Sequence, residues 1–98
     1  MQLSIKGLED KASWQKANIK LPTYDIKKMR SVTSSKPEWI HFGAGNIFRG
    51  FIAALQDKLL NEGLEQSGII AAETFDYDII KKIYDPFDNL TLMVTLKA

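Results

Sequence analysis

The 98-residue sequence predicts an α/β fold, in which strands and helices alternate in the order β-α-β-α-β around a parallel sheet. Two short apolar runs, residues 38–42 and 68–74, are each followed by a helical pattern, and an alternating run comes last. Apolar residues make up 45% of the chain and charged residues 26%, which is the balance of one ordinary globular domain. We therefore expect residues 38–98 to be the first part of a layered domain, with residues 1–37 as an N-terminal extension.

The N-terminal extension contains one clear helix signal. Asp25 precedes the run "IKKMRSV", and an aspartate in that position accepts hydrogen bonds from the first free N–H groups of a helix. Pro37 closes the polar connector "TSSKP" and disfavours helical conformation in Lys36 just before it. We expect this extension to pack on another part of the protein, with Trp14 as an anchor.

The first strand and helix follow directly. The run "EWIHF", residues 38–42, suits a strand covered on both faces, as in a parallel sheet. After "GAG", apolar residues recur every four positions from Ile47 to Leu59, which predicts a helix of about four turns. Gly63 is expected to end that helix, because glycine readily takes the left-handed conformation beyond a helix C-terminus.

The second half of the chain repeats the alternation. "GIIAAET", residues 68–74, predicts a second strand, and "DYDIIKKIY", residues 76–84, predicts a short helix that Asp85-Pro86 stops. In "NLTLMVTLK", residues 89–97, leucine and valine alternate with the other side chains. A period of two is typical of a half-exposed strand, so an edge strand or a hairpin arm is expected there.

Charge and residue usage exclude several classes of function. The 13 basic and 12 acidic residues give a net charge of +1, which favours neither nucleic acid nor an anionic membrane as a partner. Without cysteine there is no thiolate metal site, and the lone His41 is interpreted as a packed core residue rather than a base or metal ligand. No apolar run is long enough to span a bilayer and no secretory signal pattern is present, so a cytoplasmic protein is expected.

The junction between the first strand and its helix carries the strongest chemical signal. Gly43 and Gly45 match the first two positions of G-x-G-x-x-G/A, where one glycine turns the chain and the next lets a pyrophosphate approach the backbone. Phe48 occupies the third position, and Gly50 is a candidate for its close-packing role. A plain turn is the alternative interpretation. The candidate cofactor-binding residues of this loop are Gly43, Gly45, Asn46, Ile47, Phe48 and Arg49.

An acidic residue after the second strand completes the dinucleotide-binding pattern. Glu73 lies at the carboxyl end of that strand, where a carboxylate can accept hydrogen bonds from ribose hydroxyls. Asp76 is the competing candidate, although it also suits the N-cap of the next helix. Since an acid here would repel a 2′-phosphate, NAD is favoured over NADP. Together these features predict a partial Rossmann-type NAD(P)-binding domain.

The quoted residues also resemble a known family. "LPTYD", "WIHFGAGNIFRGFIAALQDKLL" and "ETFDYDIIKKIYDPFDNLTLMVTLKA" are similar to the N-terminal part of the long-chain mannitol dehydrogenase family over residues 20–98. The resemblance implies an oxidoreductase that transfers a hydride between a nicotinamide cofactor and a polyol or sugar acid, of the mannitol or mannonate–fructuronate type, without a catalytic metal. Phe48 argues against the mannitol-phosphate branch, which has glycine at that position.

The family's catalytic lysine, asparagine and histidine match nothing in this sequence. The resemblance therefore implies an N-terminal fragment with no catalytic residue of its own, inactive alone. Uncovered strand edges in such a fragment lead us to expect self-association. The alternative is a stand-alone nucleotide-binding or oligomerisation module without catalysis.

Overall fold

The computed structural model describes residues 1–94 of the chain. These residues belong to two compact units. The larger unit is Pro22–Tyr77, and the smaller one combines Met1–Leu21 with the chain from Asp78 onward. The candidate loop and the acid that follows the second predicted strand both lie in the larger unit.

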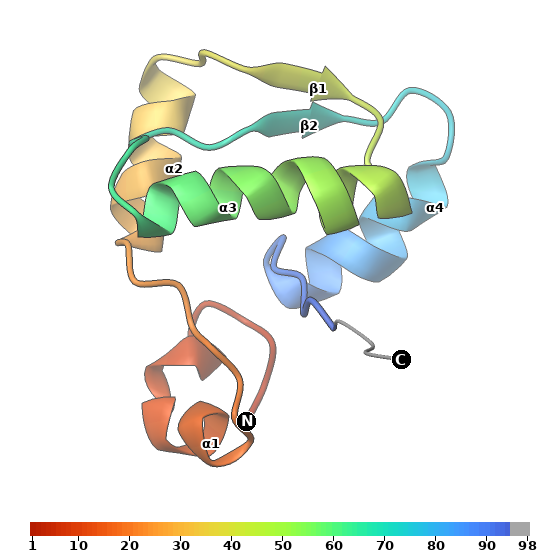
Figure 1. Ribbon diagram of the computed structural model, residues 1–98. Helices are drawn as coiled ribbons and strands as arrows, with labels where there is room; N and C mark the ends of the chain where they lie inside the picture. Colours follow the sequence, from red (N-terminus) through yellow and green to blue (C-terminus); the bar gives the residue numbers. More distant parts are fainter. Residues whose placement is uncertain (95–98) are drawn as a thin grey trace. The chain divides into compact units, whose positions relative to one another are not determined.

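The larger unit contains a two-stranded parallel sheet (Figure 1). Strand β1, Ile40–Phe42, pairs with strand β2, Ile70–Ala72, and His41 lies opposite Ala71. The first two predicted strands and their parallel arrangement are thereby confirmed. The expected cover on both faces of the first strand is wrong, because Ile40 and Phe42 on one face of β1 are 54% and 72% exposed. Both strands end at the same edge of the sheet, which is also where the glycine loop begins.

One continuous helical segment connects the two strands and covers one face of the sheet (Figure 1). It contains a π-helical stretch, η2, Phe48–Ile52, followed by the α-helix α3, Ala53–Asn61. Gly63 follows with φ of +73°, its N–H donates to Leu60 O, and the next N–H donates to Leu59 O. This is the Schellman arrangement, and it confirms the predicted helix end.

The buried face of this helix differs from the predicted stripe. Phe48 and Leu60 are buried, whereas Ile47, Phe51 and Leu55 are 80%, 62% and 52% exposed. The apolar side chains of the helix thus extend over a wider part of its surface than the part that is buried. Periodicity identified the helix correctly, but it did not identify which apolar face the sheet covers.

Helix α2, Ile26–Ser35, belongs to the same unit. The Asp25 carboxylate accepts a hydrogen bond from the Lys28 N–H at 3.1 Å, which confirms the predicted N-cap. The Thr33 hydroxyl of this helix accepts a hydrogen bond from the Gly68 N–H at 2.8 Å, just before β2. The helix is thus tied to the start of the second strand.

Thr23 and Tyr24, which precede α2, form hydrogen bonds with the C-terminal half of α3. The Thr23 N–H donates to Asn61 Oδ1 at 2.8 Å, and the Tyr24 hydroxyl donates to Asp57 Oδ1 at 2.6 Å. Burial, together with this bond to Asp57, raises the pKa of the Tyr24 phenol well above its ordinary value of 10.0. Thr23 and Tyr24 therefore hold the chain before α2 against the C-terminal half of α3.

In the smaller unit, Trp14 is the buried anchor that the sequence predicted. It lies in α1, Lys11–Lys16, and its indole N–H donates to Gly7 O at 2.9 Å. A short 3₁₀ helix, η1, Gly7–Glu9, precedes α1. The Ile5 N–H donates to Asp88 Oδ2 at 2.8 Å, which joins the two ends of the chain within this unit.

The last predicted helix is present, but the strand after it is not formed in the part of its range that the structure describes. Helix α4, Tyr77–Ile79, continues into a π-helical stretch, η3, Ile80–Tyr84, and a 3₁₀ turn, η4, Asp85–Phe87. Residues 90–94 have no regular structure, so the predicted strand is wrong there, and its residues 95–97 lie outside the described residues. An alternating pattern specifies two faces, but a strand also needs a pairing partner.

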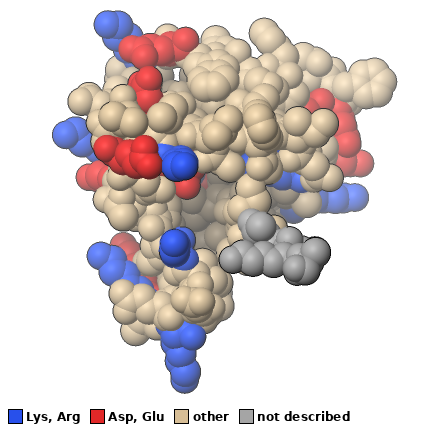
Figure 2. All heavy atoms as spheres, viewed as in Figure 1, with Lys and Arg blue, Asp and Glu red and all other residues tan. Residues whose placement is uncertain are grey.

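Basic and acidic side chains are interspersed on the face of the molecule shown in Figure 2. Neither sign gathers into a continuous patch there. Within residues 1–94, every helix is too short or too polar to cross a bilayer.

Candidate functional site

The candidate site lies where the carboxyl ends of β1 and β2 meet. The Gly43 N–H donates to Ala72 O at 2.7 Å, so the parallel ladder continues into the first residue after β1. In open α/β sheets, ligands bind outside the carboxyl ends of the strands. The glycine loop, residues 43–46, leaves the sheet at that position and leads into the helix.

Gly43 has the backbone conformation that the motif requires of its first glycine. Its φ is +109°, a value that residues with a Cβ rarely adopt. The conformation is held from both sides, because the N–H is bound to Ala72 and the carbonyl oxygen lies 3.0 Å from Nδ1 of His41. The structure therefore gives Gly43 the role of a sharp turn out of the strand.

Gly45 leaves open space on the loop. A Cβ built on this residue would have no heavy atom within 4 Å, so the surroundings in this chain do not require glycine there. The first intrahelical hydrogen bond runs from the Arg49 N–H to Gly45 O at 3.0 Å. The N–H groups of Asn46, Ile47 and Phe48 precede that bond, and N–H groups in this position at a helix start bind anions.

Phe48 replaces the third glycine of the motif without occupying the open side of the loop. Its ring is buried and lies against the His41 ring of β1, with centroids 4.7 Å apart and an angle of 32° between the planes. The aromatic pair packs helix against strand, which is the task the third glycine performs by being small. His41, half-buried, takes part in this packing as its position in the strand predicted.

Glu73 faces the glycine loop from the end of β2. Its Oε2 accepts a hydrogen bond from the Ala44 N–H at 2.9 Å, and its Oε1 accepts from the N–H groups of Phe75 at 3.2 Å and Asp76 at 3.1 Å. The bonds from Asp76, Ala44 and Phe75 lower the pKa of the Glu73 carboxyl below its ordinary value. The carboxylate thus stays ionised and joins the two segments that follow the strands.

Arg49 braces the same loop from the helix. Its Nη1 donates to Ala44 O at 2.8 Å, and its Nη2 donates to the side-chain oxygen of Asn46. Asp76 is exposed and immediately precedes α4, and its N–H is bound to Glu73. The structure therefore brings all the sequence-predicted residues to one edge of the sheet, but it directs Arg49 onto the backbone of the loop.

Ala44 is the residue of this site that the sequence reasoning missed. It is fully buried, its N–H is held by Glu73, and its carbonyl oxygen is held by Arg49. Its position between two glycines is compatible with a small buried residue, but sequence spacing alone gives no sign that both of its peptide groups are bound by side chains.

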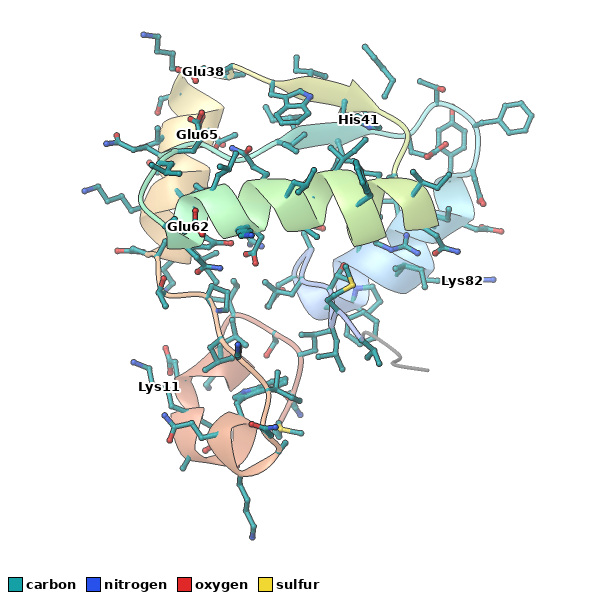
Figure 3. All side chains as sticks on the ribbon, viewed as in Figure 1. Lys11, Glu38, His41, Glu62, Glu65 and Lys82 are labelled. Atoms are coloured by element: carbon teal, nitrogen blue, oxygen red, sulfur yellow. The ribbon has the colours of Figure 1, made fainter. Side chains whose placement is uncertain are left out.

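A separate hollow of about 320 Å³ lies in the same unit, at the amino end of the strands. Figure 3 shows Glu38 and Glu65 on that side, away from His41. Its lining residues are Glu38, Trp39, Gln56, Leu59, Glu65, Ser67 and Gly68. Because none of these residues belongs to the glycine loop, the hollow is not part of the candidate site.

The geometry of the loop suits a diphosphate. A left-handed glycine turns the chain, the space beside Gly45 is open, and the first N–H groups of a helix follow. An ionised carboxylate lies at the end of the neighbouring strand, in the position from which dinucleotide-binding proteins contact a ribose. The residues present thus fit the diphosphate and ribose part of a dinucleotide.

The chain is similar to a D-mannonate oxidoreductase from Thermotoga maritima. The two are 45% identical over 97 residues, which is 99% of this chain and 18% of that protein. The matched region is the N-terminal part of the relative, so the resemblance inferred from the sequence is confirmed. No family model and no solved structure matches the chain.

Proposed function

We propose, from the similarity of this chain to the N-terminal part of a D-mannonate oxidoreductase, that it is the cofactor-binding part of an oxidoreductase acting on a sugar acid. The chain spans about a fifth of that relative's length, 18%, so the activity belongs to a longer protein of this kind. The observation that carries the proposal is the coincidence of the left-handed Gly43, the open side of Gly45 and the facing carboxylate of Glu73 at one sheet edge.

The cofactor we propose is NAD. The N–H groups of Asn46, Ile47 and Phe48 would hold its diphosphate, and the open side of Gly45 would admit it. The negative charge of Glu73 and Asp76 disfavours the additional 2′-phosphate of NADP. When bound, the nicotinamide ring supplies the position that gives or takes a hydride, while these residues only bind and orient the cofactor.

The proposed division of the chain follows the sequence. Residues 38–98 would be the first part of a Rossmann-type domain, and residues 1–37 would be its extension. Proton exchange with the substrate needs a base placed near the nicotinamide. We assign no catalytic residue to this chain, because the family's lysine, asparagine and histidine match nothing in this sequence. The D-mannonate named for the relative is the substrate to test first in the longer protein.

Self-association of the 98-residue chain is part of the same proposal. Ile40 and Phe42 are on the same face of β1 and are 54% and 72% exposed, and both strands of the sheet have an unpaired edge among the described residues. Surface of this kind favours pairing with a second copy of the chain. Sedimentation of the chain as a monomer at high concentration would argue against this part.

The test is a titration of NADH into the 98-residue chain, followed by the fluorescence of the reduced nicotinamide. We expect saturable binding, weaker binding of NADPH, and competition by ADP-ribose, which carries the same diphosphate and adenosine ribose. A chain that is folded by circular dichroism but binds neither nucleotide would contradict the assignment of the site. A matched titration of the longer protein then tests D-mannonate as substrate with NAD.

A further inference from the structure

Glu73 is bound in a way that a ribose contact alone does not require. Its two carboxylate oxygens accept three backbone hydrogen bonds, from Ala44 on one side and from Phe75 and Asp76 on the other. Ala44 is 29 residues away in the chain and belongs to the glycine loop. The two segments that follow the parallel strands are therefore joined through a single side chain, an arrangement we call the Glu73 clasp.

Only a carboxylate of this length fits the clasp. Both of its oxygens act as acceptors and neither carries a proton at neutral pH. Glutamine has the same shape but would present an NH₂ group to one of the two sets of N–H donors. Aspartate keeps the charge but is shorter by one methylene, so it loses reach across the gap.

The clasp fixes the peptide groups of the loop. The Ala44 N–H is held by Glu73, and its carbonyl oxygen is held by Arg49, so both polar groups of one fully buried residue are bound by side chains. The next residue, Gly45, is the one whose open side the proposed function uses. Fixing Ala44 thus fixes the direction from which a ligand meets Gly45 and the helix start.

The clasp also limits what Glu73 can offer to a ribose. A carboxylate has about four lone-pair positions, and three of them are taken by backbone N–H groups. One position remains, on Oε2, which can accept one hydroxyl but not two. The largest effect of Glu73 on a ligand therefore comes through the conformation of the glycine loop that it holds.

We propose that Glu73 is a positioning residue that orders the glycine loop before a ligand binds, by holding Ala44 in place. The part of the loop that it orders, Gly45 and the first N–H groups of the helix, is the phosphate seat. The inference rests on the proposed function in so far as the seat takes a diphosphate. A loop ordered beforehand loses less conformational entropy on binding, so the clasp raises affinity even for a ligand that never touches Glu73.

The experiment uses inorganic pyrophosphate, which has no ribose, with the wild-type chain and Glu73→Gln. We expect Glu73→Gln to bind pyrophosphate about tenfold more weakly, the effect of losing one hydrogen bond to a charged group. A role limited to the ribose predicts no such loss, because removing a carboxylate from the neighbourhood of an anion leaves its affinity unchanged or increases it. Glu65→Gln, which loses the same charge at the other end of the sheet, is the matched control and should bind as wild type does.

Glu73→Asp separates charge from reach. It keeps the negative charge and shortens the side chain, so the clasp predicts weaker pyrophosphate binding here as well. If Glu73→Asp binds as wild type does, the positioning role is overturned. If Glu73→Gln does not fold, pyrophosphate binding by Glu73→Asp still tests the proposal.

Amide hydrogen exchange at Ala44, measured by NMR without ligand, tests directly whether the hydrogen bond from the Ala44 N–H to Glu73 is formed. We expect protection in the wild type and its loss in Glu73→Gln, while the Ile70 N–H, bound to Trp39 O, stays protected as evidence that the sheet is intact. Retained protection at Ala44 in Glu73→Gln would overturn the clasp. A wild type that protects Ala44 but does not bind pyrophosphate would overturn the phosphate seat of the proposed function and leave the bond itself standing.

Discussion

Alanine substitutions at Gly43 and Gly45 should affect different properties, stability in the first case and ligand binding in the second, although the two glycines are only two residues apart. Gly43 has φ of +109°, whereas Gly45 has no left-handed conformation and nothing within 4 Å of a built Cβ. We therefore expect Gly43→Ala to weaken the fold and Gly45→Ala to weaken only ligand binding. The comparison separates the role of glycine in the chain from its role toward a ligand.

The magnitude at Gly43 comes from the backbone alone. A Cβ there would lie 3.9 Å from His41 Cε1, an ordinary contact that costs nothing. The hydrogen bond from Gly43 to Ala72 O at 2.7 Å prevents the residue from relaxing to a negative φ without breaking the ladder. Residues held in such a region cost about 1–3 kcal/mol each, so Gly43→Ala should lower the free energy of unfolding by that amount.

Gly45→Ala should change the free energy of unfolding by less than about 0.5 kcal/mol, because the new methyl group enters open space. The same methyl group would occupy the side from which a diphosphate approaches, so binding of NADH should be lost or strongly weakened. Urea unfolding followed by circular dichroism gives the first quantity, and the fluorescence titration gives the second.

Three results would refute this reasoning. If Gly43→Ala is as stable as wild type, the left-handed conformation is not required at that residue. If Gly45→Ala keeps the affinity of wild type for NADH, the open side of the loop is not where the ligand lies. Equal destabilisation by both substitutions would show that the loop tolerates no side chain for reasons of packing.

The Tyr24–Asp57 hydrogen bond and the Glu73 clasp give two further predictions, both dependent on pH. Because the pKa of Tyr24 is raised, its contribution to stability is complete below pH 10.0 and is lost as the pH rises beyond that value. Tyr24→Phe should lower the free energy of unfolding by about 1 kcal/mol at neutral pH and remove this alkaline dependence, which urea unfolding at several pH values would show. The lowered pKa of Glu73 means that the clasp is complete above pH 4.5 and is lost as the pH falls through the folded-state value, so the Ala44 protection factor should drop only in that acidic range. An Ala44 protection factor that falls already between neutral pH and pH 4.5 would contradict the second prediction.

Local sequence determined the elements of the larger unit well. Asp25 gave the start of α2, Gly63 gave the end of α3, and the two apolar runs gave β1 and β2, because capping, left-handed turns and apolar periodicity act between neighbouring residues. The strand predicted from the alternating run at residues 89–97 is not formed in the described part of that range, since a strand depends on a partner elsewhere in the fold. Periodicity likewise did not show which apolar side chains of this helical segment would be buried, because burial depends on what packs against the helix.

The sequence by itself determined that two glycines stand between a strand and a helix, and that an acid follows the next strand. Only the tertiary structure decided what those residues do. Parallel pairing brings Glu73 to within hydrogen-bonding distance of Ala44, while the path of the chain from β1 into the helix directs Arg49 onto the loop backbone and Phe48 against His41. The reason is physical. Motif spacing reports conformations that a residue and its neighbours can adopt, whereas hydrogen-bond partners 29 residues apart are set by the register of the sheet.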